Sequence, residues 1–164
     1  TSYQIYRSTA KDGDYQNIKT INSVGTSSWT DSSVKTGKTY YYKIKTVVKT
    51  QNGEQTSGFS NVKSAKAVPA KTTLKAKASD AKNVKLTWSK VKGASGYEIY
   101  RSNSKDGKYS KVKTISKGST TSYKNGKLKK STTYYYKIRA YRKVNGKKVY
   151  GSYSSVVSVK TKAK

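Results

Sequence analysis

The most informative features of this sequence are those it lacks. Its 164 residues include no cysteine, methionine or histidine, a single proline and only seven acidic residues. Without cysteine the chain can form no disulfide, thiolate metal site or cysteine nucleophile. No stretch approaches the roughly 18 consecutive apolar residues of a membrane-spanning helix, so we expect no membrane insertion. Because the chain does not begin with methionine, we expect it to be a piece of a longer protein with further domains upstream.

Catalysis without histidine or cysteine would depend on carboxylates, lysine, serine or tyrosine. Most of the carboxylates fall in predicted turns, and no pair of them is kept in both halves of the chain; they are Asp12, Asp14, Asp31, Glu54, Asp80, Glu98 and Asp106. Asp12 and Asp14 offer oxygen ligands for calcium, but two carboxylates fall short of a site. We therefore predict no enzymatic activity, no metal site and no cofactor.

The residues that are abundant favour strands and polyanionic partners. Sixteen tyrosines stand in a background of serine, threonine, lysine and glycine, which suits strands and turns better than helices. Only 32% of the residues are hydrophobic, so two small cores fit better than one large core. The formal net charge of +29 indicates a surface that attracts nucleic acid, anionic lipid or the anionic polymers of a bacterial wall.

The chain contains an internal repeat with an offset of 94 residues. Tyr3-Gln-Ile-Tyr-Arg-Ser8 recurs as Tyr97-Glu-Ile-Tyr-Arg-Ser102, and Thr39-Tyr-Tyr-Tyr-Lys-Ile44 recurs as Thr133-Tyr-Tyr-Tyr-Lys-Ile138. The only proline, Pro69, lies between the copies and marks a boundary. We therefore place one module at residues 1–68 and a second at residues 69–164.

Alternating apolar residues in the second copy predict short strands around Leu74 to Ala78, Val84 to Trp88, Tyr97 to Ile99, Val112 to Ile115 and Tyr134 to Ala140, with Val156 and Val159 at the end. Hairpin signals separate them, at Lys105 to Gly107 and at Asn145 and Gly146. About seven short strands in a domain of this size are typical of an immunoglobulin-like β-sandwich.

Three segments carry a family resemblance: Trp88, the run Gly96 to Ile99, and Leu128-x-x-Ser-Thr-x-Tyr134. They resemble the fibronectin type III pattern, in which the last segment forms a tyrosine corner. The Lys- and Tyr-rich composition is most similar to repeats in large extracellular proteins of clostridia-like Firmicutes. The resemblance implies tandem all-β sandwiches with no catalytic residues, in a secreted or cell-wall-associated bacterial protein.

The first module is predicted to be incomplete. Thr1 corresponds to Ser95 at the repeat offset, so about 25 residues that match the first two strands have no counterpart. A sandwich without these strands would leave an inner face and a sheet edge open. Either the chain has been trimmed, or another chain donates the missing strands.

The long strands predict a candidate binding face. Side chains alternate between the two faces of a strand, and Tyr134 belongs to the inward set, so the intervening residues lie outside. This outer set consists of Tyr135, Lys137, Arg139 and Tyr141 with Tyr100 beside it, and of Tyr41, Lys43 and Lys45 with Tyr6 beside it in the first copy. Such a face can stack sugar rings or bases and pair with phosphates, or it can simply be the solvated cover of a sheet.

Charge is distributed unequally between the copies. Residues 1–68 carry a net charge of +6, whereas residues 69–164 carry +23. These features favour a non-catalytic structural and adhesive module that spaces other domains and binds anionic wall polymer or glycan. Two alternatives stay open: a nucleic-acid-binding module, although no specific nucleic-acid motif is present, and a fibre subunit completed by strands from a neighbouring chain.

Overall fold

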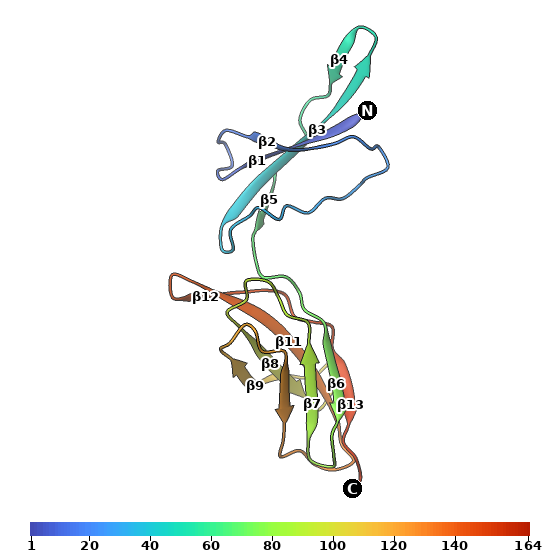
Figure 1. Cartoon of the computed structure of the whole chain (residues 1–164), viewed down its shortest axis with the longest axis vertical. Coiled ribbons are helices and arrows are strands. Elements are labelled where there is room, and N and C mark those ends of the chain that lie inside the picture. Colours follow the sequence, from blue (N-terminus) through green and yellow to red (C-terminus); the bar gives the residue numbers. More distant parts are fainter. The chain divides into compact units, whose positions relative to one another are not determined.

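The computed structural model describes residues 1–164 and consists of strands, turns and loops, as the sequence predicts. It divides into two compact units, Thr1–Ala67 (unit 1) and Val68–Lys164 (unit 2), which are described separately (Figure 1). No helix is long and apolar enough to cross a membrane.

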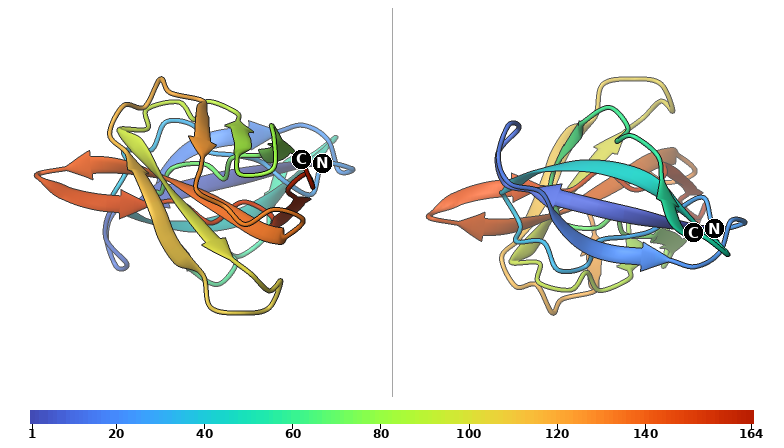
Figure 2. Two further views of the ribbon diagram at one scale, coloured as in Figure 1. Left: turned by 90° about the horizontal axis from the view of Figure 1, so that it is seen from below. Right: turned by 90° about the horizontal axis from the view of Figure 1, so that it is seen from above.

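Unit 2 is a complete two-layered sandwich. Its strands are β6 (Leu74–Ala78), β7 (Val84–Trp88), β8 (Gly96–Ser102), β9 (Ser110–Ile115), β10 (Ser122–Asn125), β11 (Thr133–Val144), β12 (Lys147–Tyr150) and β13 (Val157–Lys160). One sheet has the order β10-β7-β6, and the other has the order β12-β11-β8-β9, with β13 also paired to β11. The hairpin of β11 and β12 extends well beyond the sheet opposite (Figure 2).

The core of unit 2 forms where the inner faces of these two sheets meet. Val84 and Leu86 on β7 are fully buried, and so are Ile99 on β8 and Ile138 on β11. The predicted inward set of β11 is confirmed, because Tyr134, Tyr136, Ile138 and Ala140 are all buried. Burying side chains of this size contributes about 1.5–3 kcal/mol each before conformational entropy is counted. The period-2 pattern of the long strand therefore fixes which of its faces is internal.

Both units contain the tyrosine corner that the sequence indicates. In unit 2 the hydroxyl of Tyr134 accepts a hydrogen bond of 3.0 Å from the backbone N–H of Lys129. In unit 1 Tyr40 accepts the equivalent bond of 3.0 Å from Lys35. Each bond ties the start of the long strand to the connection that precedes it.

Unit 1 consists of a single sheet. Its strands are β1 (Ser2–Ser8), β2 (Gln16–Ile21), β3 (Thr39–Thr50), β4 (Gly53–Thr56) and β5 (Lys63–Lys66), in the order β2-β1-β3-β4 with β5 also paired to β3. Nothing in unit 1 corresponds to the sheet of β6, β7 and β10. Residues 22–38 form no strand, whereas the matching part of unit 2 contains β10, a strand that the alternation pattern did not reveal. In unit 2, β10 pairs with β7. Unit 1 has no strand equivalent to β7, so residues 22–38 have no strand with which to pair.

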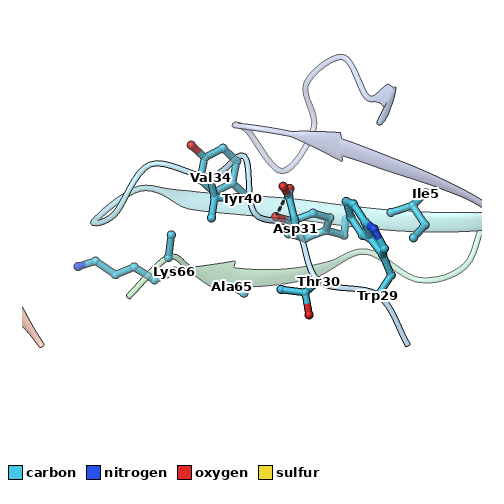
Figure 3. A pocket seen from close by; sticks show the side chains of 10 residues that line it. Ile5, Trp29, Thr30, Asp31, Val34, Tyr40, Ala65 and Lys66 are labelled. Carbon is cyan, nitrogen blue, oxygen red and sulfur yellow. Dashed lines mark hydrogen bonds between the residues drawn. The ribbon is translucent and has the colours of Figure 1, made fainter. Parts of the chain in front are cut away.

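The inner face of the unit 1 sheet is consequently open. Ile44 is 42% exposed, whereas Ile138 at the equivalent position of β11 is completely buried. Trp29, in the segment that crosses this face, is also 37% exposed. Together with Ile5, Tyr40 and other residues it lines a pocket of about 450 Å³ (Figure 3). The first copy therefore has the inward pattern of a sandwich without the layer that would cover it.

An ion pair holds the crossing segment against the sheet of unit 1. The guanidinium of Arg7 on β1 lies 2.6 Å from the carboxylate of Asp31 and also donates to Ser33. The hydroxyl of Tyr42 donates to the same carboxylate at 3.1 Å, and burial together with this bond raises the pKa of Tyr42 to about 12. In unit 2 an amide, Asn125, stands in place of the carboxylate.

Unit 1 is expected to open more readily than unit 2, because its sheet buries far less apolar surface. Brief trypsin digestion of the native protein should cut first between residues 22 and 38, after Lys35 or Lys38, while β8 and β11 stay intact. Mass spectrometry of the early fragments checks this order. First cuts inside β8 or β11 would contradict it.

Candidate ligand-binding face

The outer face of the larger unit 2 sheet carries the residues predicted for ligand binding. Tyr100 on β8 pairs across the sheet with Lys137 on β11, and Glu98 pairs with Arg139. Tyr135 lies two residues from Lys137 on the same side of β11. Tyr100, Tyr135, Lys137 and Arg139 are each partly exposed. The structure thus brings these four predicted residues together on one surface.

Two further rings enclose the ammonium group of Lys137. Its Nζ lies 4.3 Å from the ring centroid of Tyr109, in the β8–β9 turn, and 4.5 Å from that of Tyr153, which follows β12. Tyr109 is held in place because its hydroxyl donates to the backbone oxygen of Lys105 at 2.9 Å. Tyr153 packs edge-on against Tyr100, with centroids 5.2 Å apart. Cation–π attraction therefore fixes the position of this charge.

Unit 1 repeats the arrangement at the 94-residue offset. Lys43 Nζ lies 4.3 Å from the ring centroid of Tyr15 and 4.0 Å from that of Phe59, and Phe59 packs edge-on against Tyr6 at 5.0 Å. The hydroxyl of Tyr15 donates to the backbone oxygen of Lys11 at 2.8 Å, as Tyr109 does to Lys105. Tyr41 lies two residues from Lys43 on the same side of β3. Tyr6, Tyr41, Lys43 and Lys45 of the predicted set are thus also found together.

We call this surface the aromatic–cationic face. In unit 2 it comprises Tyr100, Tyr109, Lys137, Arg139, Tyr150 and Tyr153, and in unit 1 it comprises Tyr6, Tyr15, Lys43, Lys45 and Phe59. The prediction from the strands missed the rings that come from turns and connections. One sequence signal was available. At the 94-residue offset, Tyr15 matches Tyr109 and Phe59 matches Tyr153, so each position is aromatic in both copies.

Tyr141 is a correction to the predicted face. It projects from the outer side of β11 as expected, but it is only 1% exposed. Its cross-strand partner is Gly96, and its ring fills the space that this glycine leaves, so that a Cβ on Gly96 would lie 2.6 Å from the Tyr141 hydroxyl oxygen. The hydroxyl donates to the backbone oxygen of Ile115 at 3.3 Å, and the rings of Tyr141 and Tyr150 are in contact. Tyr141 is therefore a structural residue of the outer layer and is not available to a ligand.

Beneath the face lies a buried carboxylate. Glu98 is only 1% exposed, although it points to the outer side of its sheet. It accepts hydrogen bonds from Arg139 at 2.8 Å, Tyr100 at 2.9 Å, Lys148 at 3.0 Å and Tyr150 at 3.2 Å, and Lys111 lies 3.6 Å away. Three cations thus share one anion, which leaves the cluster with an excess of positive charge.

These partners keep Glu98 ionised. Burial alone would raise the pKa of Glu98, but the hydrogen bonds from Arg139, Lys148 and Tyr100 outweigh it and lower the pKa from 4.5 to about 2. In return, the hydrogen bond that Lys148 donates to Glu98 raises the pKa of Lys148. The hydrogen bonds of the Arg139 guanidinium use Nε and Nη2, while its Cζ lies 3.7 Å from the ring centroid of Tyr150. The guanidinium is consequently held by the Glu98 carboxylate and lies over the ring of Tyr150.

Unit 1 lacks this carboxylate. Gln4 stands at the position of Glu98 and accepts one bond of 2.8 Å, from the hydroxyl of Tyr6. Asn17 stands in place of Lys111, and Glu54 in place of Lys148. The rings and the enclosed lysine are therefore common to both units, whereas the buried ion cluster is specific to unit 2.

Replacing Glu98 by glutamine tests the cluster. The lowering of the Glu98 pKa from 4.5 to about 2 corresponds to about 3 kcal/mol. E98Q should therefore lower the free energy of unfolding of unit 2 at pH 7 by about 2–3 kcal/mol. Since the folded pKa lies below the unfolded one, this stabilisation is complete above about pH 4.5 and is lost as the pH falls towards about 2. Chemical denaturation of both proteins across this range measures it.

The matched control for E98Q is Gln4→Glu, which places a carboxylate where fewer cations face it. Q4E should not stabilise unit 1. A difference between wild type and E98Q that stays constant from neutral pH to pH 2 would contradict the assigned role of the ionised carboxylate.

Comparisons with known proteins agree with this architecture. No family model and no curated protein matches the sequence. Among solved structures, the FN1–FN3 domains of chicken CNTN1 match 98% of this chain at 20% identity and a TM-score of 0.51, over 56% of that chain. The sixth fibronectin type III domain of human fibronectin type III domain containing protein 3 matches 61% of this chain at 18% identity and a TM-score of 0.50, over 92% of that domain.

At these identities the likeness establishes the fold alone. The chain has the fold of tandem fibronectin type III sandwiches, the first without its opening strands, as the sequence predicts. This chain spans just over half of the CNTN1 chain that it matches.

Proposed function

We propose that the chain is a non-catalytic structural and adhesive part of a secreted or cell-surface bacterial protein. In this proposal the two units space or display other domains of the same polypeptide. They also bind an anionic wall polymer or glycan through the aromatic–cationic face. The observation that carries the proposal is the recurrence of this face in both units, with a lysine enclosed by two rings at the same positions.

The recurrence is informative because the core does not require it. Lys43 and Lys137 lie on the outer sides of their strands, where an ordinary solvated residue would serve the fold equally well. Both units nevertheless hold the ammonium group between rings from a turn and from a later connection. Fixing a long side chain in advance lowers the entropy that binding would otherwise cost.

The chemistry of the face suits an anionic glycan. Aromatic rings offer apolar surfaces on which sugar rings can stack, and the lysine and arginine groups pair with phosphate or carboxylate. In unit 2 Lys111, Lys137, Arg139 and Lys148 outnumber the single carboxylate of Glu98. An anion arriving at this surface therefore meets net positive charge in both units.

Binding to purified walls at low and high salt tests the proposal. Wild-type protein should be retained at about 50 mM salt and released as the salt is raised, because the attraction is electrostatic. The double variant K43Q/K137Q should bind about tenfold more weakly, since it removes the enclosed cation from each unit. A co-sedimentation assay measures the bound fraction.

The matched control is K11Q/K105Q, which removes the same charge from equivalent turn positions. These side chains are exposed, and only their backbone oxygens bond to Tyr15 and Tyr109. Failure to bind walls at any salt would exclude polymer binding, and equal losses in the two variants would exclude this face. Tighter binding to DNA than to wall polymer of matched charge would favour the nucleic-acid alternative.

A fibre subunit is the second candidate function, and the open inner face of unit 1 favours it. Ile44 and Trp29 are exposed there, and Ile5 and Tyr40 line the pocket beside them. Strands from a neighbouring chain could cover this face as β6 and β7 cover that of unit 2.

Sedimentation velocity at increasing protein concentration distinguishes the fibre candidate. Fibre assembly predicts a concentration-dependent polymer that the substitution I44K abolishes, because a charge cannot be buried under an added strand. V48K is the matched control, since Val48 is similarly exposed at 40% but lies near the β3–β4 hairpin. A wild-type monomer at every concentration would exclude assembly.

A further inference from the structure

A second charged surface lies on the other sheet of unit 2, away from the aromatic–cationic face. The outward positions of β6, β7 and β10 are occupied by Lys75, Lys77, Lys85 and Lys124, all exposed, with Thr87 and Ser122 between them. The intervening residues, such as Leu74 and Leu86, point into the core. The three strands lie side by side and form one of the two layers of the unit (Figure 1).

The register of these strands places three lysines in one row. Lys77 pairs directly with Lys85, and Lys85 pairs directly with Lys124. Neighbouring strands lie about 4.8 Å apart, so three like charges share one line across the sheet. Like charges directly opposite each other destabilise a sheet. The row of Lys77, Lys85 and Lys124, which we call the lysine row, therefore opposes folding unless something compensates for it.

No ion pair offsets the repulsion within the lysine row. The five ion pairs of the chain involve none of its members. Asp80 is the only acidic residue of β6, β7, β10 and the β6–β7 turn, and its carboxylate accepts bonds from the backbone N–H of Lys82 and the side chain of Asn83. These bonds, with a smaller effect of Lys124, lower the pKa of Asp80.

The surface around the row offers hydroxyl groups and a shallow hollow. Lys85, Ser122 and Lys124 line a depression of about 300 Å³ together with Ser79 and Tyr123. Tyr123 supplies the aromatic ring of this depression, but its position opposite Leu86 faces inward and the ring packs against the core, so the outward positions of β6, β7 and β10 hold no aromatic residue. The row combines point charges with hydrogen-bond donors but offers no platform on which a base could stack.

We propose that the lysine row is a second binding site, for a linear polymer that carries repeated phosphate groups. Each lysine pairs with one phosphate, and Ser122 and Thr87 donate to the same groups. The absence of aromatic residues from the outward strand positions favours a flexible phosphodiester polymer over a single-stranded nucleic acid. Two of its lysines, Lys77 and Lys85, lie in residues 68–94, which carry seven lysines and one acidic residue and have no counterpart in unit 1.

The test uses the full chain and purified poly(glycerol phosphate), with affinity measured over a range of salt. The triple variant K77Q/K85Q/K124Q should bind at least about tenfold more weakly and lower the slope of log K against log salt by about 2 to 3. The matched control K90Q/K92Q/K117Q removes the same charge from exposed loop positions and should have a clearly smaller effect on both quantities. Equal losses in the two triple variants would overturn the proposal.

Thermal stability distinguishes a binding role of the lysine row from a structural role. Relief of the repulsion should leave the Tm of K77Q/K85Q/K124Q unchanged or raised while binding falls. The single variant K85Q should show the same combination with a smaller loss of affinity. A lower Tm in K85Q that accounts for its weaker binding would overturn the assignment.

Single-stranded DNA of matched charge identifies the class of polymer, because its binding gains from aromatic stacking. The lysine row variant should weaken DNA binding no more than the loop control does. A loss as large as that for poly(glycerol phosphate) would overturn the proposal in favour of nucleic acid. Both triple variants keep Lys43 and Lys137. A negative result for the lysine row therefore leaves the proposal for the aromatic–cationic face standing, and the reverse is also true.

Discussion

Each long strand of this protein must present one face to a core and the other to solvent, and the rest of the structure depends on that constraint. Along β11 the inward side chains reach Val84 and Leu86 of the opposite sheet, and the outward ones form the aromatic–cationic face. Along β3 the same alternation exists, but no second sheet covers Ile44. One pattern thus produces a sealed core in unit 2 and an open surface in unit 1.

Much of the fold could be predicted because both the repeat and the alternation are local properties of the sequence. The inward set from Tyr134 to Ala140 and the two tyrosine corners follow from them, and the structure confirms both. The strand β10 could not be found in this way, because it is only four residues long and exists through its pairing with β7. Unit 1 has no counterpart of β7 and also no counterpart of β10, as expected if β10 forms only by pairing with β7.

The candidate site was only partly predictable, because alternation along a strand does not report what folds back over it. Tyr109 and Tyr153 reach Lys137 from a turn and a connection. Glu98 is buried on a face that alternation assigns to solvent, and Tyr141 is buried because Gly96 leaves space opposite it. These placements arise from tertiary packing, which a strand pattern does not encode.

The positive charge of unit 2 is used in two different ways on its two sheets. On one sheet Arg139, Lys148 and Lys111 surround the buried Glu98, so part of their charge stabilises the protein itself. On the other, the lysine row forms no ion pair, and its like charges lie opposite each other across the sheet, which opposes folding. We therefore propose that binding depends on the enclosed Lys137 and on the lysine row, and not on the total charge.

The most direct test is an NMR titration of the ¹⁵N-labelled chain with poly(glycerol phosphate), which locates the contacts residue by residue. We predict that shift changes concentrate around Lys43 on β3, Lys137 on β11 and Lys85 on β7. Changes spread evenly over all exposed lysines, including those of the turns and loops, would contradict it, because they would show that net charge alone attracts the polymer.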